Sequence, residues 1–343
     1  MNYLFFDFES QYYLSGFPSS DAFALETPDG VAQFLDMRYY SEASDRQKKG
    51  ELKDNVTLYR LDCGVFKALK EYVSAKNIKK LYVDCKLVSL YMYEKLKAEL
   101  PDIEIEYRSD ILTERRMIKT SFEKEMIKKA QSVTDLAFET VLKKIRRGVT
   151  ENEIAAEIEY VFKMNGCDKA FDTIAVSGKK SAYPHGVPSD VVISENAFLT
   201  MDFGAKYRGY CSDMTRTVVL GKAGEEMKKV YYTVLEAQKR GIDAVRNGVK
   251  GSDVDKAARD VIEKAGYGKY FTHSTGHSLG LEIHEMPRSS SKSEDVLKTD
   301  EFMTVEPGIY IEGFGGVRIE DTVCVTENGC DDYAGSPKEL IEL

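Results

Sequence analysis

The spacing of apolar positions changes about a third of the way along the chain. Before that point, strand-like segments at residues 23–27 and 81–88 alternate with a segment at 89–100 whose apolar residues recur at helical spacing. This alternation predicts a small α/β unit. We therefore expect a first domain over residues 1–113 and a second over residues 114–343.

The second region opens with two segments of helical pattern. Thr120 and Glu123 have the spacing of a capping box, and Thr150 and Glu153 repeat it. Apolar residues then line one face of each predicted helix: Met126, Ile127, Ala130, Val133 and Ala137, then Ile154, Ile158, Val161 and Phe162. The glycines expected to end the helices are Gly148 and Gly166.

From Phe171 onward, strand-like segments and glycine-bearing turns predominate. Helices are expected at about residues 225–246 and 252–265. The pattern predicts an antiparallel sheet covered by helices, so the whole chain is expected to be α+β.

Composition narrows the class of protein without identifying it. The 343 residues are 43% hydrophobic and 31% charged, as in ordinary globular proteins, and the net charge of −9 argues against nucleic acid or an anionic membrane as partner. The six cysteines show no CxxC spacing, so we expect them to stay reduced. Because the first residues lack a basic segment and no apolar stretch reaches membrane-spanning length, we expect a cytoplasmic protein.

Acidic residues occur inside apolar strand-like segments, where an unpaired carboxylate is costly. Asp202 and Asp213 are eleven residues apart around a glycine turn, and Glu306 and Glu320 are fourteen apart around another, so a hairpin would place each pair side by side. With His277, these carboxylates make a ligand set suited to Mn²⁺, Co²⁺, Fe²⁺ or Zn²⁺. The five residues predict a site for two metal ions.

The motifs around these residues resemble the pita-bread metallopeptidase family, which includes Xaa-Pro aminopeptidase, prolidase, methionine aminopeptidase and creatinase. The resemblance follows the family's order over residues 114–343: FDTIAVSG, SAYPHG, MDFGAKYRGYCSDMTRT, HSTGHSLGLEIHEMP, MTVEPGIYI and GGVRIEDTV. The first domain, with YYLSGFPSSDAFAL and FLDMRYYSEA, resembles the accessory domain of the Xaa-Pro branch. The resemblance implies a creatinase-like domain followed by a pita-bread domain, whose curved sheet carries its ligands on the concave face.

The resemblance also implies roles for the site residues. Asp202 would chelate one ion, Asp213 and Glu320 would bridge both, and His277 with Glu306 would complete the other. Glu306 would also carry the proton from the attacking water to the leaving nitrogen. In the family, the histidines that correspond to His185 and His284 face the substrate and the tetrahedral intermediate. The implied cofactor is two divalent ions per subunit, expected to be Mn²⁺, with Co²⁺ or Zn²⁺ as alternatives.

Other residues near the motifs allow more than one interpretation. His273 would contact substrate or support His277, and Arg318 would anchor the site or the substrate unless it is a surface residue. Cys211 is interpreted as a small strand residue beside the site. Two positions depart from the family pattern: Ser278 replaces a glycine, and Tyr183 replaces a smaller aliphatic residue and is expected to reshape a substrate subsite.

The predicted function is that of a two-metal hydrolase, an Xaa-Pro aminopeptidase acting on short proline-containing peptides, with Xaa-Pro dipeptidase (prolidase) as the alternative. A non-catalytic pita-bread binding protein and creatinase-like C–N hydrolysis without metal are disfavoured because all five ligand positions are filled. The family suggests a homodimer. The sequence leaves open the native ion, the preferred first residue of the substrate and the choice between dipeptides and longer peptides.

Overall fold

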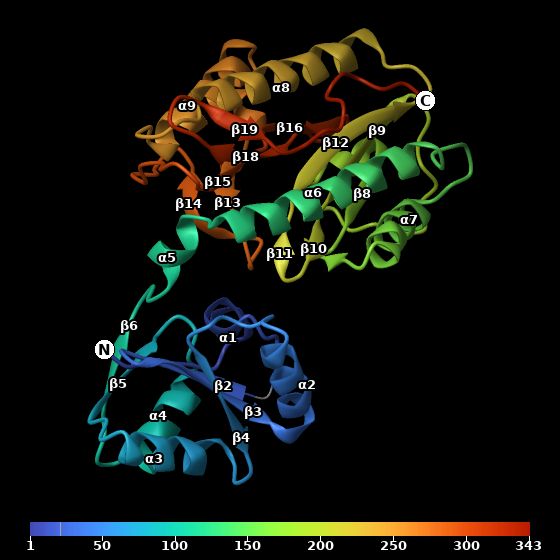
Figure 1. Cartoon of the computed structure of the whole chain (residues 1–343). Coiled ribbons are helices and arrows are strands. Elements are labelled where there is room, and N and C mark those ends of the chain that lie inside the picture. The colour runs from blue at the N-terminus through green and yellow to red at the C-terminus, as the bar shows by residue number, and fades with distance from the viewer. Residues whose placement is uncertain (21) are drawn as a thin grey trace. The chain divides into compact units, whose positions relative to one another are not determined.

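The computed structural model describes residues 1–20 and 22–343. The chain forms two compact units, Met1–Glu114 and Arg115–Leu343 (Figure 1). The sequence-predicted boundary, between residues 113 and 114, lies one residue before this division. Among the helices described, none has the length and apolar character needed to cross a membrane.

The first unit is built on a mixed six-stranded sheet. Its strands, in spatial order, are β4 (Val56–Leu61), β3 (Gly30–Asp36), β2 (Ala22–Thr27), β1 (Tyr3–Phe5), β5 (Lys80–Asp84) and β6 (Glu104–Arg108). Strands β2 and β3 form an antiparallel hairpin, whereas β1, β5 and β6 run parallel.

Helices cover both faces of this sheet (Figure 1). Leu69 of α3 (Val65–Ala75) and Leu96 of α4 (Leu90–Glu99) pack on one face. Leu14 of α1 (Phe8–Ser15) and Ala43 of α2 (Met37–Lys48) pack on the other. The predicted α/β unit is therefore confirmed.

One predicted strand is shorter than its pattern suggests. Residues 81–88 read as strand, but β5 ends at Asp84 and the chain then turns. The Asp84 carboxylate accepts hydrogen bonds from the backbone N–H of Lys86 (3.0 Å) and of Ile111 (2.9 Å), which stabilises the turn. A short polar side chain thus overrides the apolar pattern that follows it.

The second unit begins with the two predicted helices. After the short helix α5 (Thr113–Met117), α6 (Ser121–Leu142) and α7 (Glu151–Met164) each start with a capping box, as predicted. Gly166 follows the end of α7 in the left-handed region (φ 71°). Gly148 does not end α6, which stops at Leu142; it forms the turn before α7, also at positive φ.

The remaining elements are short strands and two further long helices. Helices α8 (Glu225–Ala244) and α9 (Gly251–Lys264) lie within two residues of their predicted bounds, and η1 (Gly178–Ala182) and η2 (Gly268–Tyr270) are 3₁₀ turns. The strands form antiparallel groups: β12 (Met214–Leu220), β9 (Ala197–Phe203) and β8 (Ile174–Ser177); β11 (Tyr210–Cys211), β10 (Ala205–Tyr207) and β7 (Asp168–Lys169); β13 (Gly276–Ser278) and β14 (Glu285–Ser289); β15 (Phe302–Val305), β18 (Asp321–Val325) and β19 (Cys330–Asp332); β16 (Gly308–Ile311) and β17 (Gly315–Arg318).

Alternation along the strands separates a helix-facing side from a polar side. In β9, Leu199, Met201 and Phe203 join the apolar core formed with α6 and α7. Asp202 and Thr200 therefore project from the other side of the strand. The helices α8 and α9 cover a second core that includes residues of β16 and β17 (Figure 1). This is the pita-bread arrangement: antiparallel strands with helices outside and polar residues inside.

Candidate active site

Two strand pairs bring the four acidic residues together. Asp202 lies in β9 and Asp213 directly precedes β12, its antiparallel partner. Glu306 directly follows β15, and Glu320 directly precedes β18, which pairs with β15. Each predicted pair thus lies at the ends of adjacent strands, and the smaller hairpins β10–β11 and β16–β17 form the connections.

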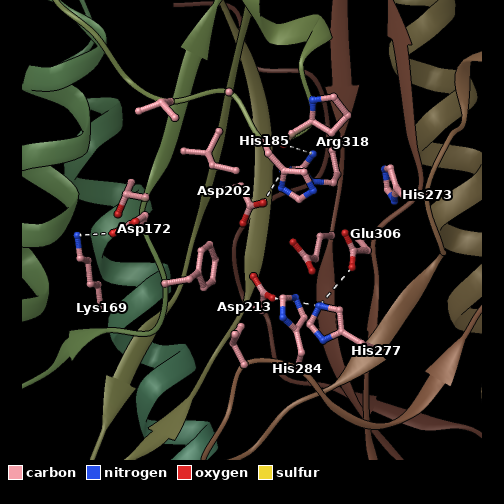
Figure 2. Close-up of a pocket in the computed structure, with 18 of the residues that line it drawn as sticks. Lys169, Asp172, His185, Asp202, Asp213, His273, His277, His284, Glu306 and Arg318 are labelled. Carbon is pink, nitrogen blue, oxygen red and sulfur yellow. Dashed lines mark hydrogen bonds and ion pairs between the residues drawn. The ribbon is translucent and has the colours of Figure 1, made fainter.

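The acidic residues line a cavity of about 780 Å³ in the second unit. Figure 2 shows the carboxylates of Asp202, Asp213 and Glu306 pointing toward its centre. The cavity is also lined by Glu320 and Arg318 and by all four histidines of the chain: His185, His273, His277 and His284. The fold therefore collects nine of the ten residues that the sequence singled out for this chemistry.

Three of the predicted ligands have atoms close enough to share one ion. One ligand atom each from Asp213, His277 and Glu320 lies within 4.8 Å of the others. His277 Nε2 is 3.6 Å from Asp213 Oδ2 and 3.4 Å from Glu306 Oε1. Its Nδ1 lies 3.0 Å from the carbonyl oxygen of Ser278, which favours a proton on Nδ1 and leaves Nε2 free as an acceptor. This tautomer is the one that would ligate a metal through Nε2.

Burial and mutual repulsion perturb the acids strongly. Burial, followed by the Glu320 carboxylate, raises the pKa of Asp213 well above its ordinary value. Burial raises the pKa of Glu306 to about 8, and burial with the Glu306 and Asp202 carboxylates raises the pKa of Glu320. Burial also lowers the pKa of His277 to about 4, so the imidazole is neutral at pH 7. The five predicted metal ligands therefore carry no positive charge of their own at pH 7.

Unsatisfied atoms give a second sign that the site is built for cations. Oδ1 of Asp202 and Oδ1 of Asp213 are buried and have no hydrogen-bond partner in the part of the chain that the structure describes. A buried polar atom without a partner is costly. Carboxylate oxygens and a neutral imidazole are ligands for divalent metals, so these residues fit such ions.

One arginine offsets part of the negative charge. Arg318 is buried, which excludes the surface interpretation, and its guanidinium forms an ion pair with Asp202. It also donates hydrogen bonds to Thr215 Oγ1 (3.0 Å) and to the Tyr310 hydroxyl (2.6 Å). The Thr215 hydroxyl in turn donates to Glu320 Oε2 at 2.7 Å, so Arg318 orients acids of both strand pairs.

The histidines other than His277 occupy distinct positions. His273 Nε2 is 2.9 Å from the Tyr310 hydroxyl, and burial and Arg318 lower its pKa to about 4. His284 packs edge to face on His277, with ring centroids 4.5 Å apart (Figure 2), and the residue as a whole is exposed. His185 is exposed at the cavity wall. Both are open to a substrate.

Two sequence expectations concern residues at the edge of the site. Tyr183 is not part of the cavity lining and is 60% exposed, whereas residues 184–188, which follow it, line the cavity. Cys211 is fully buried in the short strand β11, as a small strand residue would be.

The structure adds residues that the sequence did not single out. Arg288 lines the cavity, and Thr215 and Tyr310 hold Arg318. Thr215 lies in the TRT segment two residues after Asp213, so alternation along that strand could have placed it on the same face. Nothing in the local pattern marks Arg288.

Comparison with known proteins places this geometry in a family. Residues 125–327 match the metallopeptidase family M24, and residues 2–118 match the creatinase/prolidase N-terminal domain. A relative, the Xaa-Pro dipeptidase of Pyrococcus furiosus, is 40% identical over 333 residues, which are 96% of this chain and 92% of that protein.

Solved structures show the same architecture over the full length. An Xaa-Pro dipeptidase from Bacillus anthracis has a TM-score of 0.95 at 38% identity and covers all of this chain and 95% of its own. An X-Pro aminopeptidase from Thermotoga maritima has a TM-score of 0.93 at 35% identity and covers 100% and 97%. The chain therefore belongs to metallopeptidase family M24 and is a metallo-exopeptidase with a creatinase/prolidase N-terminal domain.

Proposed function

We propose that this chain is an Xaa-Pro dipeptidase that acts with two divalent metal ions. The sequence favoured an aminopeptidase, with the dipeptidase as alternative. The comparisons favour the alternative, because a dipeptidase is 40% identical over nearly the whole chain and the Bacillus anthracis dipeptidase has the higher TM-score of the two structures.

The proposed metal ligands are the five predicted residues: Asp202, Asp213, His277, Glu306 and Glu320. The grouping of Asp213, His277 and Glu320 and the unpartnered oxygens of Asp202 and Asp213 support this assignment. When bound, two such ions supply a water nucleophile near neutral pH and stabilise the oxyanion of the tetrahedral intermediate.

The remaining steps belong to side chains of the cavity. The Glu306 carboxylate, beside His277, is the proposed carrier of the proton from water to the leaving nitrogen, which in an Xaa-Pro substrate is the proline nitrogen. His185 and His284 are exposed at the cavity wall and are proposed to donate hydrogen bonds to the substrate carbonyl and its oxyanion. His273, held by Tyr310, is proposed to keep Arg318 in place.

A dipeptide differs from longer peptides by a free carboxylate directly after proline. Arg288 lines the cavity and its side chain has no hydrogen-bond or ion-pair partner in the part of the chain that the structure describes, whereas Arg318 is fully engaged. An unengaged guanidinium in the cavity suits a substrate carboxylate, which it binds in bidentate geometry. This is the observation on the chain itself that favours dipeptides.

The test is kcat/KM for a matched series: Xaa-Pro, Xaa-Pro-Xaa and Xaa-Ala. We expect hydrolysis of Xaa-Pro, weak hydrolysis of the tripeptide, and weak hydrolysis of Xaa-Ala, because a pocket shaped for the proline ring offers no acceptor for an amide N–H. Tripeptide cleavage at the rate of the dipeptide would make the enzyme an aminopeptidase instead.

The substitution Arg288→Gln further distinguishes a dipeptidase from an aminopeptidase. It should raise KM for Xaa-Pro but not for an Xaa-Pro amide, which has no carboxylate to bind. The control is Arg146→Gln, which changes an exposed arginine outside the cavity. Equal effects on acid and amide substrates would exclude Arg288 as the carboxylate anchor.

Three finer points complete the proposal. The ion is proposed to be Mn²⁺, tested by turnover of metal-stripped protein reloaded with Mn²⁺, Co²⁺ or Zn²⁺. A homodimer is proposed from the family, tested by sedimentation. A cytoplasmic location is proposed because all six cysteines are free, and fractionation of the source cells would test it.

A further inference from the structure

A second group of charged residues, most of them buried, lies beside the proposed metal ligand His277. The Glu285 cluster consists of Arg116, Lys119, Ser278, Glu282 and Glu285. Lys119 Nζ donates hydrogen bonds to Glu285 Oε2 (3.1 Å) and Ser278 Oγ (3.3 Å). The Arg116 guanidinium forms an ion pair with Glu285 and another, at 2.7 Å, with Glu282. The side chains of Lys119 and Glu285 are 1% and 7% exposed, so this contact is shielded from solvent.

The cluster holds a tight loop that carries two site histidines. Residues 278–285 link β13 to β14; His277 directly precedes Ser278, and His284 directly precedes Glu285. The backbone N–H of Glu282 donates to Glu285 Oε1 (3.2 Å), so the loop closes on the Glu285 carboxylate. A Cβ on Gly280 would come within 2.7 Å of both carboxylate oxygens. The loop is therefore folded around this one side chain.

The far side of the loop is also fixed. The backbone N–H of Cys211 donates to the carbonyl oxygen of Gly280 at 2.7 Å, which joins the loop to β11. The Lys119 backbone N–H donates to the carbonyl oxygen of Asp300 at 2.9 Å, which fixes the lysine itself. Both supports belong to the second unit, so the loop and Lys119 are anchored within one compact body.

Buried ion pairs contribute little net stability, because the cost of desolvation offsets the attraction. Burial opposes ionisation of Glu285, but Lys119 and Arg116 outweigh burial and hold its pKa below the ordinary value. The carboxylate thus stays charged, which keeps its hydrogen bonds short and directional. A charged, hydrogen-bonded carboxylate of this kind is suited to fixing the position of the loop around it.

We propose that Lys119 and Arg116 are positioning residues: through Glu285 they hold the 278–285 loop so that His284 faces the substrate beside His277. The proposal rests on the proposed function, in which His284 stabilises the oxyanion. His284 makes a ring contact with His277 and is otherwise exposed, so its own packing does not fix its place. The adjacent Glu285 does.

Lys119 also contacts Ser278, the residue that directly follows the proposed metal ligand His277. The Ser278 hydroxyl accepts the second hydrogen bond of Lys119. The lysine therefore contacts the residues that directly follow both His277 and His284. In this chain one ammonium group ties the two ends of the loop together.

The main test is Lys119→Met, which removes the charge and keeps much of the side-chain volume. We expect kcat for Xaa-Pro to fall about tenfold or more with KM little changed, since a displacement of about 1 Å can cost up to about a hundredfold. Metal content measured on the purified protein should stay at the wild-type level. Lys143→Met is the matched control, because it removes an ammonium group whose exposed ion pair with Glu139 lies outside the cavity and outside the Glu285 cluster.

Two further measurements separate positioning from loss of fold. Hydrogen exchange at residues 278–285 should accelerate in Lys119→Met while α8 and α9 keep their protection; this readout does not depend on activity. Ser278→Ala should cause a smaller change in the same direction, because the bond to Glu285 remains.

A double-mutant cycle is decisive. If Lys119 acts through His284, then Lys119→Met should have little further effect on kcat in a His284→Ala background. Additive losses, or unchanged exchange in the loop, would overturn the positioning role. Absence of Xaa-Pro hydrolysis in the wild type would instead overturn the proposed function, and the exchange experiment would still test the loop.

Discussion

Glu320 and Asp321 are neighbours in the chain, are both almost fully buried, and have opposite electrostatics. Glu320 faces the other cavity carboxylates, and burial with Glu306 and Asp202 raises its pKa. Asp321 faces the other side of the strand, where Arg216 and Lys338 outweigh the effect of burial and hold its pKa below the ordinary value. One strand thus separates an acidic site that Arg318 compensates only in part from a charge-balanced cluster.

In the balanced cluster, both oxygens of the Asp321 carboxylate accept hydrogen bonds. Arg216 donates to Asp321 Oδ1 (2.6 Å) and to the carbonyl oxygens of Glu320 (2.6 Å) and Ser336 (2.8 Å), and Gln238 Nε2 donates to Asp321 Oδ2 at 2.7 Å. In the cavity, Oδ1 of Asp202 and Oδ1 of Asp213 have no such partner among the residues that the structure describes. The difference teaches that burial of an acid alone does not indicate a metal site, whereas several buried acids with too little compensating charge do.

The largest expected effect comes from removing a cavity acid. Asp213→Ala or Glu320→Ala should abolish Xaa-Pro hydrolysis together with stoichiometric metal, because each is proposed to bridge both ions. The metal-stripped variants should unfold at temperatures no lower than stripped wild type, since one repelling carboxylate is gone. Metal analysis and thermal melts check this, and either variant with both ions and normal turnover would contradict the bridging role.

In the charge-balanced cluster, the substitution Asp321→Ala should lower the free energy of unfolding. It leaves Arg216 and Lys338 without their buried partner, and breaking such a pair costs about 3–5 kcal/mol. Urea denaturation of metal-stripped protein measures it. The control is Glu139→Ala, which breaks an exposed pair with Lys143 at the end of α6 and should change stability far less. Equal losses would mean that the cluster is not balanced as described.

His284 lies between the acidic cavity and the Glu285 cluster, next to His277 in space and next to Glu285 in sequence. His284→Ala should lower kcat by about a hundredfold, the usual cost of removing an oxyanion donor, with metal content intact. Steady-state kinetics and metal analysis of one preparation give both values. Loss of metal would make His284 a ligand.

The smallest expected effect is a pH dependence of the stability of the metal-stripped protein. The pKa of Glu306 is raised to about 8, so between pH 6.5 and 8 the folded state holds a proton that the unfolded state has lost. Stability must then fall as pH rises through this window, and the raised pKa values of Asp213 and Glu320 act in the same direction.

The pH window begins at 6.5 because two buried histidines reverse the pH dependence of stability below that value. Below it, the lowered pKa values of His273 and His277, both about 4, make stability rise with pH and would mask the slope. Urea titrations at several pH values check the sign. Metal-loaded protein should lack the slope, and a stripped protein whose stability rises from pH 6.5 to 8 would contradict the assignment.

Local pattern in the sequence determined the long helices, their capping boxes and the two acid pairs. Thr120 and Thr150 cap helices through contacts three residues away, and Asp202 and Asp213 lie on adjacent strands because the turn between them is short. Each of these depends on residues close in sequence. The end of α6 at Leu142 and the turn after Asp84 did not follow the pattern, since competing local hydrogen bonds decided them.

Tertiary structure alone decided which charges are compensated. Lys119 meets Glu285 across 166 residues and Arg318 meets Asp202 across 116, so no spacing in the sequence announces either pair. The same holds for Arg288, whose unengaged side chain becomes visible only once the cavity is assembled. Periodicity specifies the face on which a side chain lies; the electrostatic environment of that face is the sum of strands and helices that only folding brings together.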